Sequence, residues 1–322
     1  MMRDAIARAW TGWNRFWFEP AAPTDLGVAR MLFCAGVLLA YLPVDFSEWG
    51  SVAPEFWMPM PLFARLHVGP LPPAALAVVE AIWRVALVST AIGFRTRVSA
   101  TIAAVAGIYL LGLPHNFGHT FHFDALLALT LIVLAVSRCG DALSLDALMH
   151  RRQPEPGAEY RWPIRMVWCL TALVFGAAGF AKLRYGGLDW ITSSNMQVVL
   201  RRAAYHTSDA DPITGAGLWV AAHPLLCQAT AALSVAVEFG FPLALFSRRL
   251  RAILVPSALA LLVGIRILMG PTFGGFLVVN VFWVPWDRVL AALRARASSS
   301  SYYAFSPVVP RPTDSVRPGD TI

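Results

Sequence analysis

Residues 164–182 read IRMVWCLTALVFGAAGFAK, a run with no charge between Arg165 and Lys182. A helix that crosses a bilayer needs roughly 20 mostly apolar residues, because lipid offers no hydrogen-bond partners to the backbone. This run therefore predicts a membrane-spanning helix. The composition agrees, since 57% of the 322 residues are hydrophobic, only 14% are charged, and the mean hydropathy is +0.58.

Seven further apolar runs predict seven more spans. Lysine and arginine gather on the cytoplasmic side of membrane proteins, and most of the 26 in this chain fall on one side if the N-terminus lies inside. The sequence predicts an all-α polytopic transmembrane bundle of about eight spans, N- and C-termini cytoplasmic, in the cell membrane. The last run is short and contains glycine and proline. The runs cover residues 26–44, 74–93, 98–114, 121–137, 164–182, 225–246, 252–268 and 271–286.

The two ends of the chain differ from this transmembrane domain, which we place at 21–294. Residues 1–20 mix three arginines with three tryptophans, which predicts an amphipathic interfacial helix rather than a removed signal peptide. Residues 295–322 are rich in serine, proline and charge, which predicts a disordered cytoplasmic tail. The basic residues lie between apolar runs, so we expect a lipid bilayer as partner and no nucleic acid.

Two outer segments are predicted to carry structure. Residues 48–73 are rich in tryptophan and proline, which indicates a folded cap at the membrane interface. Residues 190–205 have an apolar side at helical spacing, and Thr192 or Ser193 precedes that side as a potential N-cap. We expect a short helix there that covers the outer face.

Ionisable residues within spans are costly and are usually paired or functional. Glu80 and Arg84 lie four residues apart on one helix, so an ion pair is expected, in either a structural or a functional role. Glu238 has no partner within its own helix and must be neutral, paired with another helix, or in contact with water. These three residues also allow a polar track for a transporter. Arg30 and Arg266 are expected to snorkel to an interface.

Lys182 is the only lysine among 26 basic residues. An arginine does not give up its proton in a protein, whereas a lysine in an apolar pocket can become a free amine and act as a base. The alternative is a lysine that anchors the helix end at the interface. The presence of a single lysine in the chain favours the role of a base over that of an anchor.

Six of the seven histidines fall on the predicted outer side. His115, His119 and His122 have a spacing that suits one face of a helix and, in principle, a metal site. A proline and a glycine interrupt this segment and no cysteine lies near, so we expect no metal. Asp124 follows closely and is expected to orient or charge an imidazole.

Several stretches, in this order, resemble the HTTM (horizontally transferred transmembrane) family, which includes the vitamin K-dependent gamma-carboxylases. The resemblance runs from about Leu26 to Arg288, and the order of the stretches carries it. The stretches are DLGVAR at 25–30, FGHTFHFDALLALTL at 117–131, SRCGDALSLDAL at 137–148, FGAAGFAKLRYGGLDWI at 175–191, and MGPTFGG with FWVPWDR within 269–288.

The resemblance implies a catalytic role for three residues. In the carboxylases a lysine deprotonates reduced vitamin K, and oxygenation then yields a strong base that removes a glutamate proton before CO₂ adds. Lys182 in AGFAKL matches that lysine. His122 matches the assisting histidine best, with His119 second. The implied cofactor is reduced vitamin K or menaquinone, and the implied partners are the quinone and a peptide or small-molecule substrate on the non-cytoplasmic side.

The sequence differs from the carboxylases in two respects, and several functions are therefore compatible with it. The carboxylases carry a large β-rich lumenal region, for which the sequence shows no counterpart, and Ala181 stands where the animal enzymes have another lysine. A carboxylase-like, quinol-dependent lyase activity is therefore one hypothesis. The alternatives are a non-enzymatic quinone-binding or assembly subunit and a small-solute transporter.

Overall fold

The computed structural model describes residues 2–118, 122–151, 154–206, 214–271 and 273–304. Every regular element in these ranges is a helix, apart from one isolated bridge between Ala21 and Gly157. The predicted all-α class is confirmed. The chain divides into two units, Met1–Val284 and Pro285–Ile322, and the second contains helix α15 (Trp286–Ala304).

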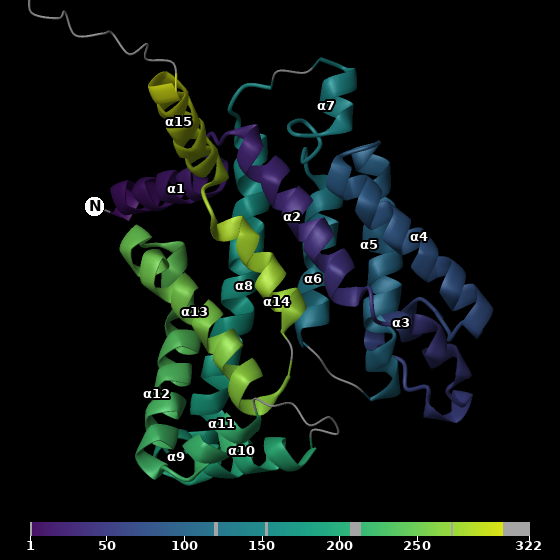
Figure 1. Ribbon diagram of the computed structural model, residues 1–322, viewed down its shortest axis with the longest axis vertical. Coiled ribbons are helices and arrows are strands. Elements are labelled where there is room, and N and C mark those ends of the chain that lie inside the picture. The colour runs from purple at the N-terminus through teal and green to yellow at the C-terminus, as the bar shows by residue number, and fades with distance from the viewer. Residues whose placement is uncertain (1, 119–121, 152–153, 207–213, 272, 305–322) are drawn as a thin grey trace, which may run out of the picture. The chain divides into compact units, whose positions relative to one another are not determined.

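Six helices in the described ranges are long and apolar enough to cross a membrane, and Figure 1 labels each of them. A seventh span results if the broken pair Gly274–Trp283 and Trp286–Arg296 counts as one. The six are α2 (Pro23–Tyr41), α4 (Pro73–Ile92), α5 (Thr96–Gly112) with the turn that continues it to Phe117, α8 (Arg161–Ala181) with flanking turns that extend it from Ala158 to Gly186, α12 (Pro224–Gly240) with the turn that continues it to Leu245, and α13 (Arg248–Met269).

The predicted count of eight spans is not confirmed. Helix α6 (His122–Val136) has 15 residues, and at about 1.5 Å per residue it is shorter than the roughly 30 Å of a bilayer core. The last predicted span, 271–286, consists of the short helix α14 (Gly274–Val279), the 3₁₀ turn η7 (Asn280–Trp283) and Pro285. Proline and glycine here interrupt what the apolar composition suggests is continuous.

Proline and glycine set several helix ends. Pro23, Pro73 and Pro224 stand at the first helical position of α2, α4 and α12, where the missing N–H costs no hydrogen bond. Gly93 ends α4 in the left-handed conformation at φ 73°. A side chain at this position would also collide with Ser144. Glycine is therefore required both by the left-handed end of the helix and by the close contact with the loop that contains Ser144.

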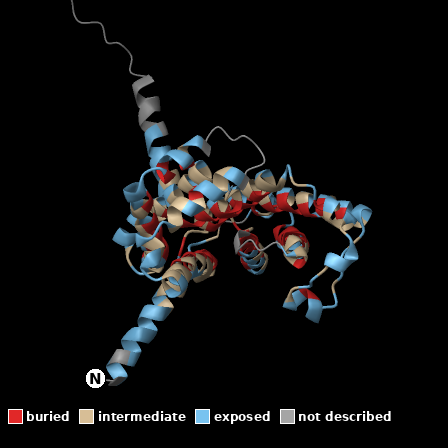
Figure 2. Ribbon diagram, turned by 90° about the horizontal axis from the view of Figure 1, so that it is seen from below, coloured by how far each residue is buried: buried red, intermediate tan, exposed pale blue. Residues whose placement is uncertain are grey.

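The long helices expose apolar side chains and bury polar ones, and buried residues (red in Figure 2) line their inner faces. Leu39 is 69% exposed and Val105 is 64% exposed, whereas Arg30, Asn116 and Thr130 are fully buried. In water such a surface would be unfavourable, but a lipid-facing surface has this character. The pattern supports a multi-pass membrane protein.

Helix α8 joins two groups of helices. On one side α6 contacts α5, α5 contacts α4, and α4 contacts α2; on the other, α8 packs against α12, which contacts α13 (Figure 1). The remaining elements are α1 (Met2–Phe18), η1 (Phe46–Ser51), η2 (Pro54–Phe56), α3 (Pro61–Arg65), η3 (Pro114–Phe117), α7 (Leu145–Met149), η4 (Ala158–Tyr160), η5 (Lys182–Gly186), α9 (Asp189–Thr192), α10 (Asn195–His206), α11 (Thr214–Ala221) and η6 (Phe241–Leu245).

The structure describes helices in the terminal and loop segments, including residues 295–304, where the sequence predicted a disordered tail. Residues 48–73 fold through η1, η2 and α3, and Trp57 contacts the rings of Phe63 and Phe117. The helix predicted at 190–205 appears as α9 and α10, with the Ser193 hydroxyl accepting the Asn195 N–H at 3.2 Å. Helix α1 occupies most of residues 1–20. Helix α15 continues past residue 295 to Ala304, and the rest of the predicted tail lies outside the described residues.

Candidate functional site

Lys182 and Glu238 form an ion pair between two membrane helices. Lys182 is the first residue of the π-helical turn η5 that follows α8, and Glu238 belongs to α12. The Lys182 Nζ donates to both Glu238 carboxylate oxygens, at 2.5 Å to Oε1. The side chain of Glu238 is 8% exposed and that of Lys182 is 22% exposed. Of the three environments expected for Glu238, pairing with another helix is the one observed.

Gly179 allows α8 and α12 to approach closely enough for this pair to form. A Cβ at position 179 would lie 2.4 Å from the backbone nitrogen of Phe239 and 2.9 Å from the carbonyl carbon of Glu238. Only glycine allows the two backbones to approach so closely, as at other membrane helix interfaces. The contact lies about one turn before Lys182, so the FGAAGFAKL segment both brings α12 close and supplies the cation that meets Glu238.

The ion pair lies at the wall of an apolar cavity of about 480 Å³. Helices α10, α12 and α13 contribute most of the lining, including Met196, Val199, Leu233, Val237, Leu261 and Ile265. Lys182 and Glu238 supply its charged groups. Few precisely placed polar groups on an apolar wall are typical of a small-molecule site.

A second cavity of about 580 Å³ shares Lys182 and Trp190 with the first. Its lining is more polar and includes Asp189, Ser193 and Asn195. The Lys182 ammonium nitrogen lies 5.6 Å from the centre of the Trp190 ring, within range of a cation–π contact. Lys182 can therefore be reached from two cavities of different polarity.

Asp124 lies in a second polar cluster. Its carboxylate accepts a hydrogen bond from the Tyr41 hydroxyl and lies 3.4 Å from Nε2 of His115. Asp124 is 5% exposed. It does meet an imidazole, and the one described is that of His115. His119 and the side chain of His122 lie outside the described residues, so their catalytic roles stay predictions.

Glu80 and Arg84 form the expected ion pair within α4. Glu80 also accepts the N–H of Phe46 at 3.0 Å, and Arg84 donates to the carbonyls of Val44 at 2.9 Å and Leu42 at 3.3 Å. Both side chains thus fasten the chain after α2 to α4. These bonds favour the structural role over a transport track.

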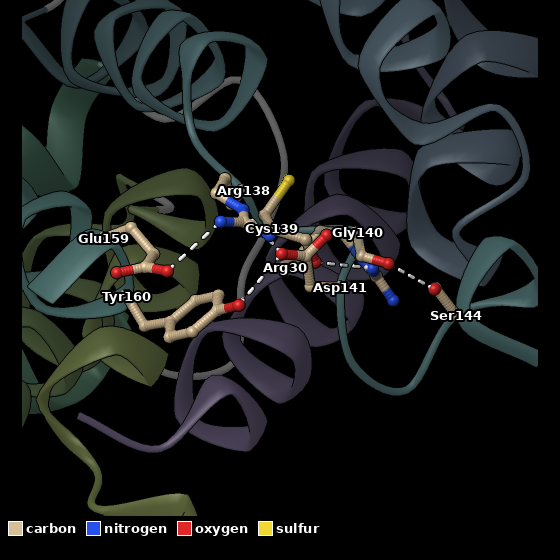
Figure 3. A network of polar contacts seen from close by, with 8 residues as sticks. All are labelled: Arg30, Arg138, Cys139, Gly140, Asp141, Ser144, Glu159 and Tyr160. Carbon is tan, nitrogen blue, oxygen red and sulfur yellow. Dashed lines mark hydrogen bonds and ion pairs between the residues drawn. The ribbon is translucent and has the colours of Figure 1, made fainter. Parts of the chain in front are cut away.

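Arg30 contradicts the expectation that it snorkels. It is fully buried, and its guanidinium donates to the carbonyls of Cys139 at 2.7 Å and Leu143 at 2.6 Å. The SRCGDAL segment at 137–143 turns backbone oxygens toward α2, and these accept from both terminal nitrogens of the guanidinium, whereas the buried Nε has no hydrogen-bond partner among the described residues. Figure 3 shows Arg30 beside this segment.

The same loop contains an extended polar network, also drawn in Figure 3. Asp141 accepts hydrogen bonds from Arg138 at 2.7 Å and from the Tyr160 hydroxyl at 2.9 Å, and Arg138 also bonds Glu159 at 3.1 Å. The sequence pattern did not reveal this network. The only available signal was that DLGVAR and SRCGDALSLDAL both belong to the family-like stretches.

Asp146 anchors the other end of this loop. Its carboxylate accepts the backbone N–H groups of Arg95 at 2.8 Å and Thr96 at 2.7 Å, and the Thr96 hydroxyl at 2.7 Å. Partial burial acts to raise the pKa of Asp146, but the hydrogen bonds from Thr96 and Arg95 outweigh it and lower the pKa below its usual value. The ionised carboxylate is therefore the form that the fold stabilises.

The described residues contain no group of three metal-ligating side chains. His119 and His122 are not among the side chains that this statement covers. Among the described groups, the Lys182–Glu238 pair has the best geometry for chemistry, because it combines a proton-bearing amine, a carboxylate and an adjoining cavity.

The bundle of apolar helices defines a multi-pass membrane protein, and within it a charged pair lies beside an apolar cavity. The HTTM domain family model matches residues 18–263. The chain belongs to the HTTM family. Comparison with curated proteins gave no match, and comparison with solved structures gave none.

Proposed function

We propose that this HTTM protein binds a reduced quinone in the 480 Å³ cavity and uses Lys182, assisted by Glu238, as a base toward the quinone hydroxyl. The observation that carries the proposal is the ion pair at the wall of an apolar cavity. His122, or else His119, is proposed to assist at the same hydroxyl, as the family resemblance implies.

The lining of the cavity fits a reduced vitamin K or menaquinone. Its volume falls within the roughly 300–1,000 Å³ of ligand pockets. Leucine, valine, methionine and isoleucine side chains suit a ring and an isoprenoid chain, and the two charged groups suit a hydroxyl. When bound, the reduced quinone would supply an acidic hydroxyl and the capacity to react with oxygen.

Glu238 gives Lys182 a route to the free amine that a base requires. The shared proton lies on Nζ of Lys182 when the pair is charged, and on a carboxylate oxygen of Glu238 when the pair is neutral. In the neutral form the amine of Lys182 is free. Lys182 then holds a proton taken from a ligand hydroxyl, while Glu238 keeps the first proton. Arginine does not release its proton and cannot replace lysine here.

The test compares the wild type with Lys182→Arg and Glu238→Gln in purified protein. Each is incubated with reduced menaquinone or reduced vitamin K and oxygen, and quinone binding and quinone epoxide formation are measured. We expect Lys182→Arg to bind quinone but to lose epoxide formation by about 10²-fold or more. Glu238→Gln keeps a hydrogen-bonding group but accepts no proton, so its rate should also fall.

Arg184→Lys is the matched control, because Arg184 is an exposed cation in the same π-helical turn. It should retain the wild-type rate. Epoxide formation by Lys182→Arg at the wild-type rate would exclude the base role. Quinone binding without epoxide in the wild type would instead support a non-enzymatic quinone-binding subunit.

A further inference from the structure

A basic cavity of about 660 Å³ lies between α1, the start of α8 and the start of α13. Four arginines line it, against one acidic residue, Glu19. The arginines are Arg15, Arg165, Arg248 and Arg251. This cavity shares no lining residue with the Lys182 cavity. The excess of positive charge in this cavity favours the binding of an anion.

Arg165 lines this cavity and has unused hydrogen-bond donors. Its Nε and Nη1 are buried and have no hydrogen-bond partner among the described residues. The guanidinium lies 4.8 Å from the ring centre of Phe16 and 4.2 Å from that of Trp168, so aromatic rings hold its plane in place. Buried donors without acceptors are rare and unfavourable, which points to an acceptor supplied by a ligand.

Two neighbours strengthen the site. Trp17, which also lines the cavity, has a buried Nε1 with no hydrogen-bond partner in the described structure. Arg251 is fixed by hydrogen bonds to the carbonyls of Ala244 at 3.0 Å and Leu245 at 3.2 Å, and it stacks over Trp168 at 4.0 Å. It therefore adds a positioned charge without movement. Arginine forks of this kind suit the paired oxygens of a phosphate.

The surroundings distinguish a lipid from a soluble ion. Helix α1 exposes Ile6, Trp10 and Trp13, and Trp13 also lines the cavity (α1 is mostly pale blue in Figure 2). The cavity of about 660 Å³ is larger than a phosphate ion needs, and apolar and aromatic side chains beside it suit an acyl chain that continues from the headgroup. The distribution of arginines predicts that this end faces the cytoplasm, where anionic lipids attract basic segments.

We propose that this cavity binds the phosphate headgroup of an anionic phospholipid, with Arg165 as the principal ligand. Arg165 and Trp17 supply the unpartnered donors, Arg15, Arg248 and Arg251 supply charge, and α1 lies along the acyl chains. The lipid then links the amphipathic helix α1 to α8 and α13.

The test measures phosphatidylglycerol, phosphatidylcholine and inorganic phosphate separately on the full-length protein in detergent, by native mass spectrometry and by thermal unfolding. The wild type should retain phosphatidylglycerol and unfold at a higher temperature with it, and phosphatidylcholine should have a smaller effect. Arg165→Gln should weaken phosphatidylglycerol binding about tenfold or more, the change expected for loss of charge-assisted hydrogen bonds.

Arg249→Gln is the matched control, because Arg249 is an exposed neighbour of Arg248 that does not line the cavity. It should bind phosphatidylglycerol as the wild type does. If Arg165→Gln does not fold, Arg15→Gln on the exposed side of the cavity gives the same test. Equal binding of phosphatidylglycerol by the cavity variant and the wild type would overturn the proposal. Equal stabilisation by inorganic phosphate would also overturn it and indicate a soluble phosphate ligand.

Discussion

Arg30 and Lys182 are both basic residues within the helical bundle, yet their partners differ. Arg30 is fully buried and donates to the backbone carbonyls of Cys139 and Leu143. Lys182 is partly exposed, and its partner is a carboxylate beside a cavity. Backbone carbonyls cannot take a proton, whereas a carboxylate can. Arg30 therefore stabilises the fold, whereas Lys182 lies where a ligand in the cavity can contact it.

The strongest test of this comparison removes Arg30. In Arg30→Met the carbonyls of Cys139 and Leu143 lose a charged donor in a buried site. We expect a loss of about 3–5 kcal/mol in the free energy of unfolding, because each hydrogen bond to a charged group contributes about 1.5–3 kcal/mol. Chemical denaturation in detergent measures the change.

Arg97→Met is the control for that experiment, because Arg97 is exposed. Its effect should stay within about 0.5 kcal/mol, as for most surface substitutions. An Arg30→Met protein as stable as the control would show that the loop does not depend on Arg30.

The second test breaks the Lys182–Glu238 pair from each side. Lys182→Met leaves a buried carboxylate without its cation, and we expect a loss of about 3 kcal/mol. Glu238→Leu should cost less, because the lysine is partly exposed and its ammonium can reach water. The double variant should be more stable than Lys182→Met alone. Unfolding free energies of all four proteins give the coupling, and simple additivity of the single changes would argue against a coupled pair.

The smallest expected effect concerns Asp146, at the exposed side of the loop that holds Arg30. Its folded-state pKa is lowered, so ionised Asp146 stabilises the fold at pH values above about 4, the unfolded value. This contribution is lost as the pH falls through the folded-state pKa. The difference in unfolding temperature between the wild type and Asp146→Asn should therefore be present at pH 6 and shrink at pH 3. A difference that does not change with pH would exclude this role.

Local patterns predicted much of the secondary structure. Apolar length located α2, α4, α5, α8, α12 and α13, because a span must satisfy its own backbone. The same reasoning predicted further spans at α6 and at 271–286, which the described helices do not confirm, although the broken pair Gly274–Trp283 and Trp286–Arg296 makes a seventh span if it counts as one. In those two places the apolar composition matched a span, but the helix was too short or was interrupted near Pro285.

For the candidate site, the sequence indicated the individual residues but did not determine their pairing. Lys182 was conspicuous because it is the only lysine, and Glu238 because it is a carboxylate in an apolar run. Their pairing was one of three alternatives, since the two residues lie 56 positions apart. The close approach at Gly179 brings them together, and no local pattern measures that approach.

The sequence by itself determined the class of protein and the approximate ends of most helices, because these depend on residues that are close together in the chain. It also determined the HTTM resemblance, because the order of the stretches is a property of the chain alone. Only the tertiary structure decided that Arg30 is enclosed by a loop 109 residues away, that Lys182 meets Glu238, and that Arg165, with its unpartnered donors, lines a basic cavity. The partners of a buried charge come from whichever helices pack against it, so the packing decides its role.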